Sequence, residues 1–181
     1  PRPVLEKVRF ADWSPDGNEL AVVRETEKGY QIEYPIGKVL CQGPSGGYIS
    51  DLRISPDGLR IAFIEHPTTS SGGYVALVDL TGQKRKLTGL YAGDARGLAW
   101  SAKGDEIWFT AIKAGARNEL SAVTLSGHDR VLSSQVAQLI LQDISRDGRV
   151  LFVATMDYRS KILFRGAGDR SERELSVMDW S

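Results

Sequence analysis

The strongest constraint in this sequence is a short motif that recurs along the chain at an almost constant interval. Its four copies are Asp12–Gly17 (DWSPDG), Arg53–Gly58 (RISPDG), Ala99–Gly104 (AWSAKG) and Asp143–Gly148 (DISRDG). The chain then ends on Asp179–Ser181 (DWS), which opens a fifth copy. The motif serines, at positions 14, 55, 101, 145 and 181, are 41, 46, 44 and 36 residues apart. A period in the low forties is the length of a repeat built from four short strands.

Each motif is followed by short apolar runs that are bounded by turn residues. The runs directly after the motif glycines are Leu20–Val23, Ile61–Ile64, Ile107–Phe109 and Val150–Val153. They are rich in Val, Ile, Leu and aromatic residues, which favours strands, and no stretch has a sustained helical period. We therefore predict an all-β chain that forms one partial β-propeller over residues 1–181. Its four four-stranded blades lie at about residues 6–46, 47–91, 92–136 and 137–176, and residues 177–181 start a fifth blade.

The Ser-Pro-Asp-Gly turn has a conformational explanation. Proline presets φ at the second position of a turn, and glycine supplies the positive φ that lets the chain reverse into the next strand. The third copy replaces Pro-Asp with Ala-Lys and the fourth replaces Pro with Arg, but both keep the glycine. We expect the turn to survive in all four copies, because the glycine position excludes most other residues.

The residues just before the motif serines divide into two sets. Trp13, Trp100 and Trp180 directly precede a serine, and we expect them to fill the space between neighbouring blades rather than to stack on a ligand. The position two before the serine is mostly charged, with Asp12, Arg53, Asp143 and Asp179.

The first strands of propeller blades surround a central channel, so these four side chains form a candidate ring at its mouth. Arg96 and Asp51 are close by in the sequence. Such a ring would bind a small cation, a peptide terminus or a loop of a partner protein. The alternative is that these side chains bond strand ends and line a solvated channel.

The repeats resemble those of TolB-like proteins and of the propellers of prolyl-oligopeptidase-type and tricorn-type peptidases. Longer strings, among them Gly97–Ser101 (GLAWS) and Glu106–Thr110 (EIWFT), are similar to the C-terminal sensor propellers of bacterial eukaryotic-type serine/threonine kinases, which are common in acidobacteria. The kinase resemblance implies a non-catalytic ligand- or protein-binding sensor on the extracytoplasmic side of a membrane-anchored parent. The other resemblances imply, as alternatives, a substrate-guiding propeller of a peptidase or a periplasmic scaffold that binds peptides.

Residues that could carry chemistry of their own have simpler interpretations. Gly43–Gly47 (GPSGG) fits the pattern around a nucleophilic serine, but no helix follows Ser45, so we interpret it as a loop between blades. His66 and His128 lie among turn residues, and we expect both on the surface. Lys84–Lys86 (KRK) is expected to keep an outer strand soluble. The sequence contains no phosphate-binding loop or calcium loop, so we expect no catalytic residue, metal or cofactor.

The amino-acid composition excludes some classes of binding partner. The 23 basic and 23 acidic residues cancel, which leaves no field that would attract nucleic acid or an anionic membrane. One cysteine, Cys41, excludes an internal disulfide, and no apolar run approaches the ~20 residues that span a bilayer.

Four blades and the start of a fifth leave two blade faces open, and open faces favour pairing with another chain. We therefore expect a homodimer through the open blade faces, in addition to a protein, peptide or small ligand at the channel mouth.

Overall fold

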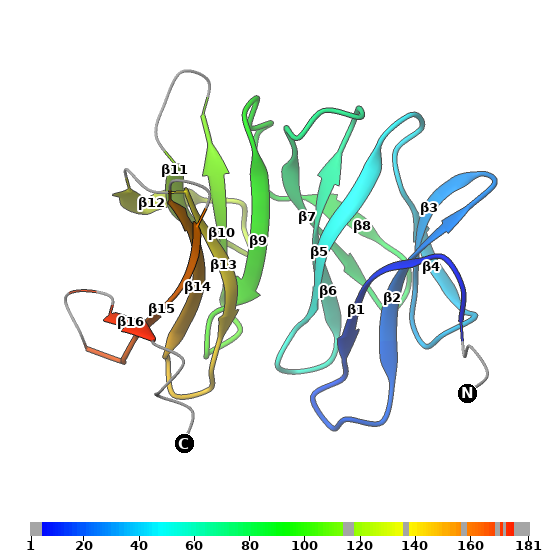
Figure 1. Cartoon of the computed structure of the whole chain (residues 1–181). Coiled ribbons are helices and arrows are strands. Elements are labelled where there is room, and N and C mark those ends of the chain that lie inside the picture. Colours follow the sequence, from blue (N-terminus) through cyan, green and yellow to red (C-terminus); the bar gives the residue numbers. More distant parts are fainter. Residues whose placement is uncertain are drawn as a thin grey trace.

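The computed structural model describes residues 5–113, 118–135, 138–156, 159–168, 171 and 173–175. Within them, sixteen strands form four antiparallel sheets of four strands each, and no described residue is helical. Each sheet is one blade, and the blades follow one another around a common centre (Figure 1). The all-β prediction and the four four-stranded blades are therefore confirmed. The predicted start of a fifth blade, residues 177–181, lies outside the described residues.

The strands of every blade follow the chain from the centre outward. Blade 1 contains β1 (Val8–Trp13), β2 (Leu20–Thr26), β3 (Gly29–Glu33) and β4 (Val39–Gln42). Blade 2 contains β5 (Tyr48–Ile54), β6 (Arg60–His66), β7 (Tyr74–Asp79) and β8 (Lys84–Lys86). Blade 3 contains β9 (Ala95–Trp100), β10 (Glu106–Ile112), β11 (Asn118–Thr124) and β12 (Asp129–Gln135). Blade 4 contains β13 (Gln138–Ile144), β14 (Val150–Met156), β15 (Arg159–Arg165) and β16 (Arg173–Leu175).

The motif forms the turn between the first and second strand of every blade. The amide of the glycine donates to the carbonyl of the serine three residues earlier, for example from Gly17 to Ser14 over 2.8 Å, and all four glycines have φ between 71° and 82°. The serine hydroxyl donates to a carboxylate in the turn, which is Asp16 in the first copy at 2.5 Å. In the third copy, where lysine replaces that aspartate, Asp105 takes over the role at 2.7 Å from the Ser101 hydroxyl. The degenerate turns therefore keep their geometry, as predicted.

Apolar side chains fill the spaces between blades. Phe63, Phe109 and Phe152, each from the second strand of its blade, are at most 1% exposed. Trp100 is 6% exposed and packs in the cluster formed by blades 2 and 3, where its indole N–H donates to the Arg53 carbonyl of blade 2 at 3.1 Å. Trp13, at the same repeat position of blade 1, is 61% exposed. The expectation that these tryptophans lie between blades is therefore confirmed for Trp100, whereas Trp13 is exposed because no described blade precedes blade 1. Trp180 lies outside the described residues.

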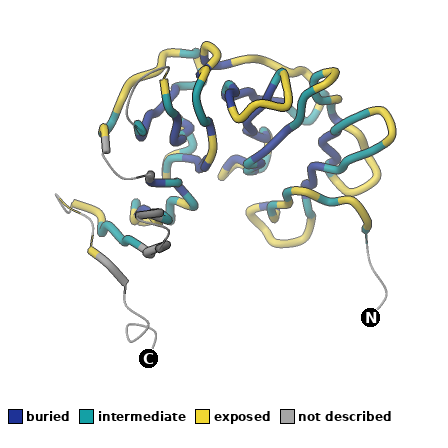
Figure 2. The backbone as a smooth tube through the Cα atoms, turned by 45° about the horizontal axis from the view of Figure 1, so that its top comes forward, coloured by how far each residue is buried: buried dark blue, intermediate teal, exposed yellow. Residues whose placement is uncertain are grey.

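The four blades lie along an open arc, with blade 1 at the end nearest the N-terminus and blade 4 at the end nearest the C-terminus (Figure 2). Buried segments occupy the interior of the arc between the sheets, and the exposed segments are mostly turns and outer strands. No helix in the described part of the chain is long and apolar enough to cross a membrane.

One histidine differs from expectation. His66 is the last residue of β6 and is 1% exposed, although the sequence suggested a surface loop. The loop after β6 folds back over it, so that the ring nitrogen Nδ1 donates to the Gly72 carbonyl at 3.0 Å. The second nitrogen, Nε2, lies 2.8 Å from the Ser50 hydroxyl, and the Tyr48 ring stacks on the imidazole at 4.0 Å. His128 lies exposed in the turn after β11, as expected.

Candidate functional site

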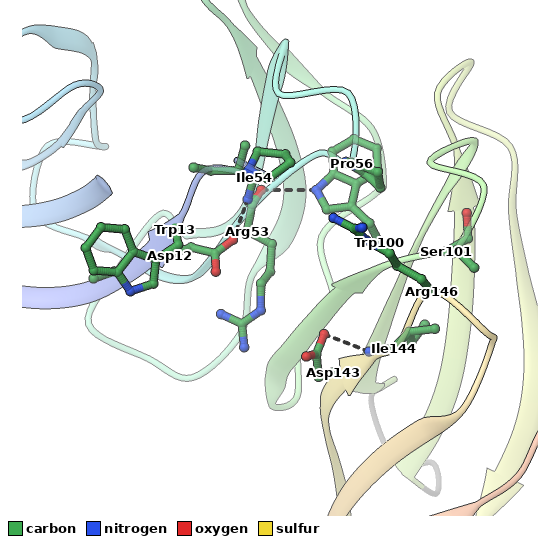
Figure 3. Close-up of a pocket in the computed structure, with 13 residues that line it drawn as sticks. Asp12, Trp13, Arg53, Ile54, Pro56, Trp100, Ser101, Asp143, Ile144 and Arg146 are labelled. Carbon is green, nitrogen blue, oxygen red and sulfur yellow. Dashed lines mark hydrogen bonds between the residues drawn. The ribbon is translucent and has the colours of Figure 1, made fainter. Parts of the chain in front are cut away.

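A cavity of about 380 Å³ opens at the end of the inner strands where the motif turns lie. Its lining follows the repeat, because most of it comes from three equivalent positions around the motif serine. The residues are Ala11, Asp12, Trp13, Pro15, Arg53, Ile54, Pro56, Trp100, Ser101, Ala102, Asp143, Ile144 and Arg146. Three of the four predicted ring residues, Asp12, Arg53 and Asp143, therefore line one cavity (Figure 3). The fourth, Asp179, lies outside the described residues.

Arg53 holds the centre of the site. Its guanidinium donates from Nη1 to the Leu52 carbonyl at 2.9 Å and from Nη2 to the Gln142 carbonyl of blade 4 at 2.9 Å. These two bonds fix the side chain across the inner side of the arc, so that it extends between Asp12 and Asp143 (Figure 3). A guanidinium has five N–H donors. Two of these donors are used in the bonds to Leu52 and Gln142, so the Arg53 guanidinium has a fixed orientation and presents further N–H donors to the cavity.

Asp12 is the more buried of the two carboxylates. It accepts a hydrogen bond from the Ile54 amide of blade 2 at 2.7 Å, which fixes blade 1 to blade 2 at the cavity wall. Burial raises the pKa of the Asp12 carboxyl above its ordinary value, and the bond from Ile54 and the charge of Arg53 act in the opposite direction. The negative charge of the Asp143 carboxylate acts in the same direction as burial on the pKa of Asp12.

The fourth blade supplies two exposed charges. Asp143 accepts a hydrogen bond from its neighbouring amide, Ile144, at 2.8 Å, and its side chain is otherwise open to the cavity. Arg146 occupies the turn position that is Pro15 and Pro56 in the first two copies. The site thus combines two carboxylates and two guanidinium groups.

Part of the cavity is lined by apolar side chains. Its apolar lining comes from Trp13 and Pro15 of blade 1, Pro56 of blade 2 and Trp100 of blade 3; Trp13 is largely exposed and Trp100 is buried at the junction of blades 2 and 3. A volume of about 300–1,000 Å³ is typical of ligand sites. The arrangement can therefore hold a ligand that has both apolar and charged groups.

The structure places two residues at the cavity, Arg146 and Trp13, that the sequence analysis did not assign to a binding site. Arg146 stands at a motif position that is proline in the first two copies and alanine in the third. This change to a charged residue was the signal in the sequence that could have pointed to it. Trp13 was expected between blades. Conversely, Asp51 and Arg96 do not line the cavity: Asp51 accepts a hydrogen bond from the Gly97 amide at 3.0 Å, and Arg96 pairs with Asp94. Asp51 therefore connects blades 2 and 3, whereas Arg96 forms an ion pair with the residue just before its own strand, β9.

Ser45 and His66, which the sequence raised as possible parts of a catalytic site, are not bonded to each other. Ser45 lies in the loop between β4 and β5, and the buried His66 bonds Ser50 instead of Ser45. Among the residues that the structure describes, no group of three or more His, Cys, Asp or Glu side chains is placed to hold a metal ion. The basic strand β8 is exposed on the outer edge of blade 2.

No family model and no curated protein matches the sequence. Solved structures share its fold. A prolyl endopeptidase aligns with a TM-score of 0.68 at 16% identity, over 93% of this chain and 29% of its own. The putative TolB from Agrobacterium tumefaciens aligns with a TM-score of 0.66 at 19% identity, over 93% of this chain and 61% of its own. The tricorn protease aligns with a TM-score of 0.66 at 10% identity, over 92% of this chain and 22% of its own.

These likenesses establish the fold as a propeller of the kind found in TolB and in peptidases. The chain spans less than two thirds of the length of each of these proteins. At identities below 20% the shared fold carries no activity with it, because one fold hosts many functions.

Proposed function

We propose that this chain is a non-catalytic binding module that receives an extended peptide segment, or a small ligand with similar groups, in the cavity at the motif end of the channel. The observation that carries the proposal is the position of Arg53, which is fixed by two main-chain carbonyls and still directs N–H donors into a cavity lined by Asp12 and Asp143. A peptide offers main-chain carbonyls to the guanidinium and N–H groups or basic side chains to the carboxylates. Its apolar side chains would contact Trp13 and Pro15.

The test uses a phage-displayed library of random seven-residue peptides, selected against the whole chain. We expect a selected peptide to bind the wild-type protein and to lose more than tenfold in affinity with Arg53→Gln. Because Arg53 also connects blades, Asp143→Asn is the second variant; this side chain is exposed and its loss leaves the blade contacts intact. The matched control is Lys28→Gln, an exposed charge in the turn between β2 and β3. Selected peptides that bind both cavity variants as tightly as the wild type would contradict the proposal.

We also propose a role for this chain as one part of a longer protein. The sequence resemblance supports the sensor or interaction domain of a bacterial serine/threonine kinase, on the extracytoplasmic side of its membrane. The fold likeness to a prolyl endopeptidase and to tricorn supports the alternative of a substrate-guiding propeller, and the likeness to TolB supports a periplasmic scaffold. Flanking coding sequence distinguishes them: a kinase domain and a membrane span upstream support the sensor, and an α/β-hydrolase domain supports the peptidase. For each of these three roles we expect the isolated chain to hydrolyse no p-nitrophenyl acetate and to phosphorylate no casein.

A further inference from the structure

The loop between β6 and β7 closes over a buried histidine at the end of blade 2 opposite the motif turns (Figure 1). We call this loop, residues 67–73 (PTTSSGG), the strap. Residues 68–71 of the strap are exposed, whereas His66 beneath it is buried. The strap contains no ionisable side chain, so His66 is the group under it whose charge can change near neutral pH.

Hydrogen bonds of the main chain connect the strap to the linker between blades 2 and 3. Gly73 and Tyr91 exchange two of them, at 3.1 and 2.9 Å, and the Ala95 amide donates to the Ser71 carbonyl at 3.0 Å. None of the strap residues belongs to the apolar core. Segments with few buried apolar contacts open at a lower free energy than the rest of a protein. The strap can therefore open while the blades stay folded, and its opening would free the linker.

The imidazole of His66 is tightly enclosed. Its Nδ1 donates to the Gly72 carbonyl of the strap at 3.0 Å, and the ring stacks on Tyr48 with 4.0 Å between ring centroids. A methyl group at Gly73 would lie 2.9 Å from Nδ1, and one at Gly47 would lie 1.9 Å from the His66 carbonyl oxygen. Glycine at these two positions lets the main chain close on the histidine, so water reaches the ring only when the strap moves.

The hydrogen bonds of His66 fit the neutral imidazole. A carbonyl can only accept, so Nδ1 carries the hydrogen and Nε2 accepts from the Ser50 hydroxyl at 2.8 Å. A second proton, on Nε2, would force this hydroxyl to turn its own hydrogen away. Ser50 is 6% exposed, and its hydroxyl has no other hydrogen bond among the described residues. Protonation would thus leave a buried donor unpaired and place a positive charge in a residue that is 1% exposed.

Two carboxylates oppose this effect. Asp51 of β5 and Asp94 of the linker act to raise the pKa of His66, although Asp94 is itself paired with Arg96. The adjacent Glu65 is engaged in an ion pair of its own. Burial is the largest influence, and it lowers the pKa of His66 below the ordinary value of 6.5. The closed strap therefore favours the neutral ring, and an open strap that admits water favours the protonated one.

We propose that the strap is an acid-released latch on the junction of blades 2 and 3: protonation of His66 opens residues 67–73 and frees the linker at Tyr91 and Ala95 while the blades stay folded. Opening would expose the Tyr48 ring and the main-chain groups that now pair the strap with the linker. The strap lies at the opposite end of blade 2 from the cavity, so its opening and the binding of a ligand in the cavity are tested separately.

Amide hydrogen exchange of the whole chain at pH 7.5 and 5.5, corrected for the intrinsic effect of pH on exchange, measures the opening. If His66 regains its ordinary pKa in the open strap, one proton favours opening by up to about tenfold at one pH unit below that value. We therefore expect opening of residues 67–73 and 91–95 to increase about three- to tenfold between pH 7.5 and 5.5. At both pH values the strap should stay at least about tenfold less protected than β10 in the core of blade 3.

His66→Gln removes the proton but keeps an amide that can donate to the Gly72 carbonyl, so its strap should respond to pH by less than about twofold. The matched control is His128→Gln, which alters the exposed histidine in the turn after β11 and should behave as the wild type. An NMR titration of the wild type needs no variant: the strap amides should titrate with the same midpoint as the His66 ring nitrogens. An equal pH response in wild type and His66→Gln, strap amides that do not follow the ring, or a strap that opens only together with β10 would each overturn the proposal.

Discussion

A close approach between the inner strands of blades 3 and 4 gives a sharp test of how the propeller is held together. Gly97, in the inner strand β9, has φ +67° and faces the inner strand β13 of blade 4. A methyl group at this position would lie 2.7 Å from the Leu141 amide nitrogen and nearer still to the Leu141 carbonyl oxygen. Both atoms belong to the main chain of a paired strand, so neither can turn aside. We predict that Gly97→Ala pushes the inner strands of blades 3 and 4 apart and destabilises the junction between these blades.

A second glycine isolates this steric effect from backbone strain. Gly17, in the first motif turn, has φ +73°, and a methyl group there meets nothing within 4 Å. Positive φ costs an L-residue about 1–2 kcal/mol, partly offset by a stiffer unfolded chain, so Gly17→Ala should lower the free energy of unfolding by about 1 kcal/mol. Overpacking adds about 1–3 kcal/mol, which gives about 2–4 kcal/mol for Gly97→Ala. A domain of ordinary stability, about 5–15 kcal/mol, still folds with that loss.

Urea unfolding of the two variants, followed by circular dichroism, measures the difference directly. We expect the midpoint to fall more for Gly97→Ala than for Gly17→Ala, with similar slopes if unfolding stays cooperative. A lower slope for Gly97→Ala would indicate that blade 4 has detached before the rest unfolds. Equal losses for the two variants, within about 0.5 kcal/mol, would refute the argument that the inner strands pack too closely for a side chain.

Three further predictions follow from single contacts. Trp100→Phe removes the donor that satisfies the Arg53 carbonyl and should lower the free energy of unfolding by about 1–3 kcal/mol in a urea titration. In carboxyl ¹³C NMR titrations, the pKa of Asp12 should lie above its ordinary value because burial raises it; Asp143→Asn should lower it and Arg53→Met should raise it further. Burial lowers the pKa of His66 in the folded state, so the unfolded chain binds its proton first as the pH falls below the ordinary value near 6.5. Stability, measured by urea unfolding at pH 7.5 and 5.5, should therefore decrease toward acid pH, and His66→Gln should reduce that dependence.

The repeat made the architecture predictable from sequence. Its period gave the length of a blade, and the motif glycines and apolar runs placed the turns and strands that the structure contains. The ring of charges was accessible for the same reason: residues at one repeat position come to one place in a propeller, and Asp12, Arg53 and Asp143 do line one cavity.

What the sequence could not reveal depends on the neighbours of each repeat. Trp13 and Trp100 occupy the same position, and only the blade that precedes each of them decides that one is exposed and the other buried. His66 stands among turn residues in the sequence, but the loop that follows it folds back and buries it. The hydrogen bond from Arg53 to Gln142, 89 residues away, depends on the curvature of the whole arc. Local patterns contain none of this long-range information.

Amide chemical shifts of the ¹⁵N-labelled chain, recorded while a selected seven-residue peptide is added, show directly whether the peptide binds in the cavity. We expect the largest shifts to cluster at the cavity, in residues 11–14, 53–55, 100–102 and 143–146, and to be lost with Asp143→Asn. Shifts confined to the outer strands β4, β8 and β12, with the cavity amides unchanged at saturation, would contradict the binding proposal.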